Sequence, residues 1–193
     1  MLDHAALDTL FRQARTQNGY LDVAVSDAQL EAVYELTKWG PTSANCSPMR
    51  IHFVRTPEGR ARLLPLVLES NRAKISAAPV TALIAYDLKF YELLPRLFPH
   101  ADARSWFAGN DALIESTAFR NSSLQGAYFM LAARACDLDC GPMSGFDPVA
   151  LNAEFFKDTS LVINFICTLG KGDPAKVFPR SPRLEFAEAC TLL

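Results

Sequence analysis

Apolar positions along the chain follow two different periods, and the first segment shows the helical one. Leu7, Leu10, Phe11 and Ala14 recur at spacings of three and four residues. This spacing places them on one face of a helix, so residues 3–14 are predicted to form an amphipathic helix.

Two further helices have recognisable starts. Ser26 and Gln29 stand three residues apart and can form a capping box, and glycine followed by proline at 40–41 ends this second helix. Thr56 followed by Pro57 starts a third helix, because proline suits the first helical position. The inward stripe of the second helix is predicted to consist of Leu30, Val33, Tyr34 and Thr37.

Three apolar stretches are predicted to form β-strands. They read "MRIHFVRT" from Met49, "PVTALIAYD" from Pro79 and "TSLVINFICTLG" from Thr159. The second is apolar almost without a break, which is typical of a strand covered on both faces. Helices and strands mix without strict alternation, so we expect an α+β fold rather than a doubly wound sheet.

The segments between these elements differ in composition. Residues 88–110 are rich in aromatic residues and prolines and are predicted to form a lid-like, partly helical excursion. Residues 111–138 are predicted to be helical. Their second half, 124–138, is apolar almost all round and is expected to be buried in a core or a subunit interface.

The last quarter of the chain is predicted to contain a loop, a helix, the third strand and a tail. "GPMSGFD" is predicted to be a loop, and the Asp147-Pro148 pair starts a short helix. Residues 170–193 are expected to form a polar, proline-rich tail that closes with a short helix. We find no repeat or linker, so residues 1–193 are predicted to be a single domain.

Composition narrows the class of protein. Half of the 193 residues are apolar, which suits one domain with a sizeable core. Lys plus Arg is 19 and Asp plus Glu is 21, so the formal charge of 19 − 21 = −2 gives no reason to expect a nucleic-acid partner. No signal-like start and no apolar run of about 18 residues is seen, so we expect a cytoplasmic protein without a membrane partner.

The cysteines and histidines do not form a metal motif. Five cysteines are scattered, and Cys136 and Cys140 are the closest pair. We expect reduced, mostly buried thiols and no metal. A cysteine hydrolase built on Cys46 and His52 is disfavoured, because no acid is placed to orient the histidine. Dinucleotide, P-loop, zinc-protease and serine-hydrolase motifs are also absent.

The chain offers instead five dispersed polar or basic segments beside glycines and prolines. They read "ARTQNG", "PTSAN", "SNRAK", "GPMSG" and "PRSPR". A flavin mononucleotide (FMN) would suit such a set. Its phosphate needs arginines and hydroxyls, its pyrimidine edge needs an amide and a cation, and its reactive nitrogen needs a backbone donor.

These segments, in this order, resemble the flavin-dependent nitroreductase family over nearly the whole chain. The resemblance is closest to the branch of the malonic semialdehyde reductase RutE (HadB/RutE-like). The strings that carry it stand here at Trp39–Pro48, Ala77–Val80, Phe98–Trp106, Ser116–Ser123 and Gly141–Asp147. It implies a nitroreductase-like fold: a central mixed, mostly antiparallel sheet flanked by helices, in an intertwined homodimer with FMN at the subunit interface.

The resemblance also implies which residues would bind FMN. The phosphate would be held by Arg15, Thr16, Asn18 and Arg183, and the pyrimidine edge of the ring by Asn71 and Lys74. The segment Pro41, Thr42, Ser43 and Asn45 would line the flavin. The loop Pro142, Met143, Ser144 and Gly145 would supply a backbone donor to the reactive nitrogen, from the partner subunit. Asn18 and Ser181 replace two family cations, so weaker FMN retention is expected.

Several of these residues could instead have a purely structural role. Arg15 could be a charge at a helix C-terminus and Lys74 a solvated one. Ser43 and Asn45 could be turn residues, and Gly145 could permit a left-handed turn. Trp106 and Phe107 could be either core residues or a cover for the flavin.

The function implied by the resemblance is an FMN-dependent NAD(P)H oxidoreductase that works in two half-reactions. NADH or NADPH would reduce the flavin, and malonic semialdehyde would be reduced to 3-hydroxypropionate in pyrimidine degradation. The alternatives are a broad NAD(P)H nitro/quinone reductase and a non-catalytic flavin-binding protein. Ser47 and Met49 depart from the common family pattern on the substrate side. Arg104, Arg50 or Arg120 could meet a substrate carboxylate, and Ser47 could assist proton transfer; spacing does not decide between the arginines.

Overall fold

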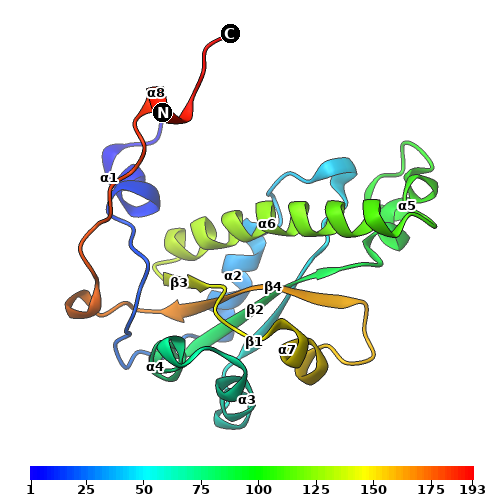
Figure 1. The fold of residues 1–193 in the computed structure, drawn as a ribbon. Coiled ribbons are helices and arrows are strands. Elements are labelled where there is room, and N and C mark those ends of the chain that lie inside the picture. Colours follow the sequence, from blue (N-terminus) through cyan, green and yellow to red (C-terminus); the bar gives the residue numbers. More distant parts are fainter.

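The computed structural model describes residues 1–193 and has a four-stranded sheet at its centre (Figure 1). The strand order is β1-β2-β4-β3, and every neighbouring pair is antiparallel. The sheet was expected to be mostly antiparallel, and its four strands are so throughout. The strands are β1 Met49–Val54, β2 Val80–Asp87, β3 Asp139–Met143 and β4 Leu161–Gly170.

The structure contains eight α-helices. The first continues into a π-helical turn, Asp8–Arg12, so the helix predicted over 3–14 ends two residues early. No helix is both long and apolar enough to span a lipid bilayer. The helices are α1 His4–Leu7, α2 Asp27–Thr37, α3 Pro57–Leu63, α4 Glu69–Ala77, α5 Leu94–Leu97, α6 Asp111–Ala135, α7 Pro148–Phe155 and α8 Phe186–Ala189.

The sheet separates two hydrophobic clusters. On one face α2 and α6 pack through Val33 and Phe129, and on the other α3, α4 and α7 pack through Leu63, Ile75 and Leu151. In Figure 1 α6 crosses one side of the sheet, while α3, α4 and α7 lie on the other. The fold is therefore a sheet covered on both faces, which the apolar run of β2 predicts.

Strand β2 shows this double burial residue by residue. Val80, Ala82 and Ile84 belong to the cluster beneath α2 and α6, whereas Leu83 and Ala85 belong to the opposite cluster. All five are at most 1% exposed. Alternate side chains of a strand point to opposite faces, so one strand serves both clusters.

The helix starts are as predicted, with one error in the buried stripe. The Ser26 and Gln29 capping box is present, and the Thr56 hydroxyl caps α3. Leu30, Val33 and Thr37 of α2 are buried, but Tyr34 is 51% exposed. Tyr34 lies further round the helix, where its ring borders a surface cavity instead of the core.

The "GPMSGFD" segment was wrongly predicted to be a loop throughout. Its first residues, Gly141 to Met143, belong to β3 and pair with β4. Strand propensity argues against glycine and proline, but β3 is an edge strand, where proline is tolerated. The loop begins at Ser144, and Asp147 then caps α7 as predicted.

The excursion at 88–110 is partly helical, as predicted, and has a core of its own. Phe90, Leu94 and Phe107 are buried in a third cluster together with Cys46. Phe107 is thus a core residue, whereas Trp106 is 52% exposed. The excursion is anchored firmly enough to carry side chains at defined positions.

Candidate functional site

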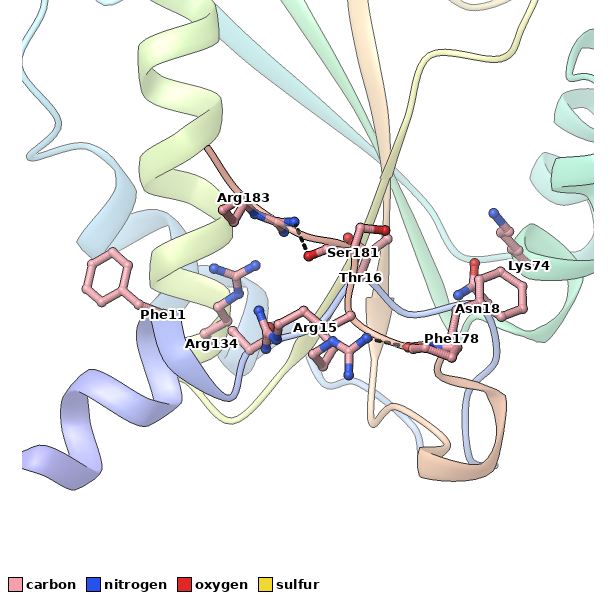
Figure 2. A pocket seen from close by; sticks show the side chains of 12 residues that line it. Phe11, Arg15, Thr16, Asn18, Lys74, Arg134, Phe178, Ser181 and Arg183 are labelled. Carbon is pink, nitrogen blue, oxygen red and sulfur yellow. Dashed lines mark hydrogen bonds between the residues drawn. The ribbon is translucent and has the colours of Figure 1, made fainter. Parts of the chain in front are cut away.

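A cavity of about 580 Å³ lies where the N-terminal loop meets the C-terminal tail (Figure 2). Side chains from α4 and from the C-terminal part of α6 complete it. We call it the first cavity. Its polar lining comprises Arg15, Thr16, Asn18, Lys74, Arg134, Arg180, Ser181 and Arg183.

The arginines of the first cavity are held by main-chain carbonyl groups. Arg180 donates to Arg12 O at 2.7 Å and Ala14 O at 3.1 Å, and Arg134 donates to Leu10 O at 2.9 Å. Arg183 donates to Ser181 O at 2.9 Å, and Arg15 donates to Phe178 O. These bonds fix the guanidinium groups without neutralising them.

No carboxylate compensates the five cations of this cavity. None of its arginines, nor Lys74, takes part in an ion pair, and no Asp or Glu lines it. An uncompensated group of arginines with nearby hydroxyls is a site for a phosphate-like anion. The donors present therefore fit the phosphate of a nucleotide cofactor.

Arg134 and Arg180 are cavity residues that sequence reasoning missed. Arg180 lies in the "PRSPR" segment, which was singled out, but only Arg183 was assigned from it. Arg134 lies near the end of a mostly apolar helix and shows no motif. The two cations stand in the cavity whose family cations were expected to be lost at Asn18 and Ser181.

Lys74 of α4 lines the first cavity, and Asn71 lies about one turn before it on the same helix without lining the cavity. Lys74 lines the cavity directly and has no ion-pair partner. Asn71 is only 8% exposed, and its Nδ2 donates to Gly145 O at 3.1 Å. A buried amide and a free cation are thereby presented side by side.

Gly145 is required by close approach and not by a left-handed turn. A Cβ at this position would lie 2.6 Å from Asn71 Nδ2, and the φ of Gly145 is not positive. The 142–145 loop was expected to reach the flavin from the partner subunit. In the structure it lies against Asn71 of its own protomer, because Leu68 N and Asn71 Nδ2 both bond Gly145 O.

The other predicted flavin segment lies at a second cavity, of about 720 Å³. Pro41, Asn45 and Ser47 line it together with Met49. The C-terminal end of α2, the edge strand β1 and the helix α5 form its walls. We call this the second cavity.

The turn that carries this segment is held from both sides. Ser43 N donates to Asn121 Oδ1 at 2.8 Å, and Ser47 N donates to Thr42 Oγ1 at 3.1 Å. Asn45 Nδ2 donates to Leu97 O at 2.8 Å, which joins the turn to α5.

The backbone of this turn is strained. Ala44, Asn45 and Ser47 have φ values of 48°, 50° and 39°. Non-glycine residues adopt such values at a cost and cluster at functional sites. The conformation therefore depends on the contacts around it.

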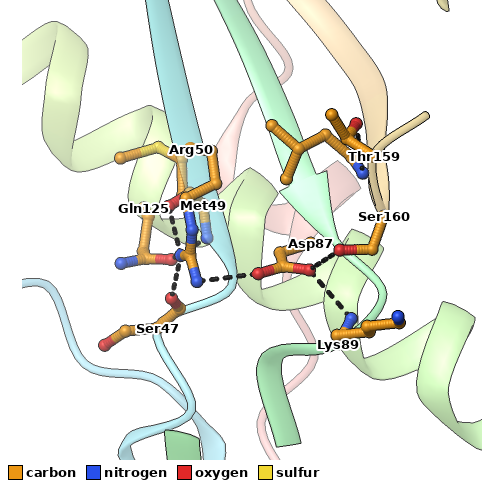
Figure 3. Close-up of polar contacts among 9 residues, drawn as sticks. Ser47, Met49, Arg50, Asp87, Lys89, Gln125, Thr159 and Ser160 are labelled. Atoms are coloured by element: carbon orange, nitrogen blue, oxygen red, sulfur yellow. Dashed lines mark hydrogen bonds and ion pairs between the residues drawn. The ribbon is translucent and has the colours of Figure 1, made fainter. Parts of the chain in front are cut away.

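Arg50 and Asp87 supply much of this support (Figure 3). Arg50 donates to Asp87 Oδ2 at 2.9 Å, to Ser47 O at 3.0 Å and to Met49 O at 2.9 Å. Asp87 also accepts from Ser160 Oγ at 2.6 Å and from Lys89 N at 2.9 Å. Arg50, one candidate for a substrate carboxylate, is thus already paired with a carboxylate of its own chain.

The two other arginine candidates lie outside both cavities. Arg104 forms two bonds to Glu92, Nε to Oε2 at 2.6 Å and Nη2 to Oε1 at 2.9 Å. The hydrogen bonds from Arg104 lower the pKa of Glu92, and Glu92 in turn raises the pKa of Arg104. Arg120 is exposed on α6 and lines neither cavity.

Cys46 and His52 do not form a catalytic pair. Cys46 is fully buried in the cluster of the excursion, and burial raises the pKa of its thiol to about 11. His52 packs edge-on against Phe156 at 4.9 Å, and burial lowers its pKa. A protonated, buried thiol is a packing residue and not a nucleophile.

The two cavities contact different stretches of α6: Gly40 of the second cavity lies against Tyr128, six residues before Arg134 of the first. Ser43 is bonded to Asn121 of this helix, while Arg134 of the same helix lines the first cavity. Asn121 and Arg134 are thirteen residues apart, roughly 20 Å at about 1.5 Å per residue. The predicted site residues of one chain therefore fall into two groups.

An α+β fold with an antiparallel sheet and a cationic cavity without a carboxylate fits a protein that binds a phosphorylated cofactor. The profile of the nitroreductase family matches residues 11–171, and the chain belongs to that family.

Curated relatives and a solved structure agree with this assignment. A Burkholderia lata protein, provisionally named NADH dehydrogenase/NAD(P)H nitroreductase, is 62% identical over 185 residues, or 96% of this chain and 95% of that protein. HadB of Ralstonia pickettii, with the same provisional name, is 56% identical over 97% of both chains. A nitroreductase-type structure from Exiguobacterium sibiricum, solved in complex with FMN, superposes with a TM-score of 0.86 at 19% identity and covers 100% of this chain and 98% of its own.

Proposed function

We propose that this protein is an FMN-dependent NAD(P)H oxidoreductase. The observation that carries the proposal is the first cavity, where four arginines and Lys74 gather without a carboxylate next to the buried Asn71 amide. The names of the B. lata protein and HadB support the nicotinamide, and the E. sibiricum complex supports the flavin.

The residues of the first cavity divide into two roles toward FMN. Arg15, Arg180 and Arg183 would hold the phosphate, together with the Thr16 hydroxyl. Lys74 would stabilise negative charge at the pyrimidine edge of the ring, and the Asn71 amide would position the 142–145 loop that lies against it. These roles need no acid, and the cavity contains none.

A second protomer would complete the site. Ser43 is anchored to Asn121, roughly 20 Å along α6 from Arg134. Pro41 and Asn45 line the second cavity and not the first, so we infer that this segment reaches the flavin from the partner protomer. Leu124 and Tyr128 of α6 are 49% and 41% exposed, an apolar stripe that a partner would cover. We therefore propose a homodimer that shares its flavin sites.

When bound, FMN would supply the hydride-transfer chemistry between NADH or NADPH and the acceptor. The net reaction for an aldehyde is NAD(P)H + H⁺ + RCHO → NAD(P)⁺ + RCH₂OH. The protein orients both partners, excludes water and holds a proton source. We assign that role to the hydroxyl of Ser47, a residue that lines the second cavity.

Malonic semialdehyde is the acceptor that we propose first, giving 3-hydroxypropionate. The second cavity suits a short anionic acceptor, because Arg96 lines it without an ion-pair partner and no Asp or Glu lines it. A broad nitro/quinone reductase is the second candidate, favoured by the names of the two curated relatives.

An absorbance spectrum and an anaerobic titration test the proposal. We expect flavin absorbance in the purified protein, bleaching by NADH or NADPH, and recovery of the oxidised spectrum on addition of malonic semialdehyde. Recovery only with nitroaromatics or quinones would favour the second candidate. A bound flavin that neither nicotinamide reduces would leave a non-catalytic flavin-binding protein.

A further inference from the structure

Three cations line the second cavity, and two of them are already engaged. Lys38 pairs with Glu35 and lies 5.8 Å from the Trp39 ring centre. Arg50 pairs with Asp87 and donates to two carbonyl groups. Only Arg96 has no ion-pair or hydrogen-bond partner in the structure.

Glu92 is the acidic residue nearest to Arg96 in the sequence. It stands four residues before Arg96, in the 3-10 turn Phe90–Leu93 that leads into α5. Both carboxylate oxygens of Glu92 are bonded by Arg104. Because Arg104 engages Glu92, the acidic residue closest to Arg96 along the chain is not paired with Arg96.

The backbone of Arg96 is held at a defined place, while the residue itself is exposed. It belongs to α5, whose Leu94 is fully buried in the excursion cluster. Leu97 O accepts a bond from Asn45 Nδ2, which ties α5 to the turn that carries Ser47. A fixed backbone beside a reactive segment is what a recognition residue requires.

We propose that Arg96 binds the carboxylate of the electron acceptor in the second cavity, an assignment that rests on the proposed function. A guanidinium group binds a carboxylate with two parallel hydrogen bonds, which also orients the ligand. Met49, Leu93 and Leu97 add apolar wall to the same cavity. The class of acceptor is a small acid with its reducible group at the other end, such as a semialdehyde acid or a nitro acid.

A pair of nearly isosteric acceptors isolates the charge. We compare 4-nitrobenzoate with 4-nitrobenzamide on the full-length, FMN-loaded protein. In Arg96→Gln we expect kcat/KM for the benzoate to fall about 10- to 100-fold, chiefly through KM, and that for the amide to change less than about twofold. Arg96→Lys should recover part of the loss. Arg62→Gln, which removes a surface pair on the opposite side of the sheet, should change neither value.

The role of Arg104 gives a second, independent prediction. Arg104→Gln frees Glu92 to pair with Arg96, so use of the benzoate should fall although Arg104 lies outside the cavity. Adding Glu92→Gln to this variant should restore it. A purely structural role of Arg104 would predict no such rescue, so its absence would contradict the argument.

Binding of both acceptors is also measured by quenching of the fluorescence of Trp39, which lines the cavity; this measurement needs no turnover. Two outcomes then separate this proposal from the proposed function. If the flavin is absent or is not reduced, the proposed function fails, while benzoate binding still tests Arg96. If Arg96→Gln weakens NADPH but not the benzoate, the guanidinium serves a nicotinamide phosphate and the proposal is overturned.

Discussion

Cys46 illustrates at the scale of one residue how burial decides reactivity. Its thiol has a pKa raised to about 11, so the reactive thiolate is scarce at neutral pH and increases only as the pH approaches that value. Cys190 is exposed. We expect iodoacetamide at about pH 8 to label Cys190 and to leave Cys46 unmodified in the native protein, as read by peptide mass spectrometry.

Substitution of Cys46 tests the same residue through FMN binding and turnover. Cys46→Ala should keep its FMN and its turnover, because the thiol contributes packing only. Loss of activity in Cys46→Ser with flavin still bound would instead return the cysteine to a chemical role.

Arg180 is the residue on which cofactor retention should depend most visibly. The resemblance implies that Asn18 and Ser181 replace family cations, from which we expect weak retention; Arg134 and Arg180 line the same cavity and would oppose that loss. A hydrogen bond to a charged group is worth about 1.5–3 kcal/mol. We expect Arg180→Gln to raise the Kd for FMN roughly 10- to 150-fold, measured by flavin fluorescence after ultrafiltration.

A surface arginine provides the control for this prediction. Arg72 lies exposed on α4 and lines neither cavity, so Arg72→Gln should leave the Kd unchanged. An equal loss of FMN in both variants would mean that net charge, and not the position of Arg180, governs retention.

At the scale of elements, the sequence predicted the features that depend on residues close together in the chain. The capping box of α2, the proline start of α3 and the double burial of β2 depend on neighbouring residues or on one apolar run, and all are present. Strand β3 was missed because Gly141 and Pro142 have poor strand propensity. Its pairing with β4, a contact distant in sequence, overrides that preference.

The candidate site follows the same division. Family resemblance pointed to Arg15, Lys74 and Arg183, and the structure brings all three to one cavity. Arg134 joins them only because the tail and the N-terminal loop fold back onto the end of α6, which no local pattern encodes. Arg96 was overlooked because its lack of an ion-pair partner depends on the pairing of Arg104 with Glu92.

The Arg50–Asp87 pair makes a prediction about the strained turn that carries Ser47. Asp87→Asn leaves the half-buried Arg50 without its countercharge and weakens the bonds that hold Ser47 O and Met49 O. We expect a loss of about 1–3 kcal/mol in the free energy of unfolding, measured by urea denaturation, together with reduced turnover.

An exposed ion pair supplies the comparison. Glu154→Gln breaks the pair with Arg62, whose side chains are 41% and 54% exposed. Exposed pairs contribute about 0–1 kcal/mol. If Asp87→Asn cost no more than Glu154→Gln, the pair would not be what supports the turn.

At the scale of the whole molecule, the predicted flavin-binding residues fall into two groups at different places along α6, which bears on dimer formation. Because Asn121, which anchors Ser43, and Arg134 of the first cavity are roughly 20 Å apart on α6, we expect flavin binding and dimer formation to be linked. Leu124 lies on the exposed apolar stripe of the same helix. We expect Leu124→Glu to yield a monomer that also loses FMN, measured by sedimentation velocity with absorbance detection at the flavin band.

An equally exposed apolar residue away from this stripe separates interface loss from general damage. Val149 is 78% exposed on α7, on the opposite side of the sheet from α6, so Val149→Glu should stay dimeric and yellow. A Leu124→Glu monomer that retained its full complement of FMN would show that one chain suffices for the site. That result would contradict a shared flavin site, because the Pro41–Asn45 segment could then not be required from the partner.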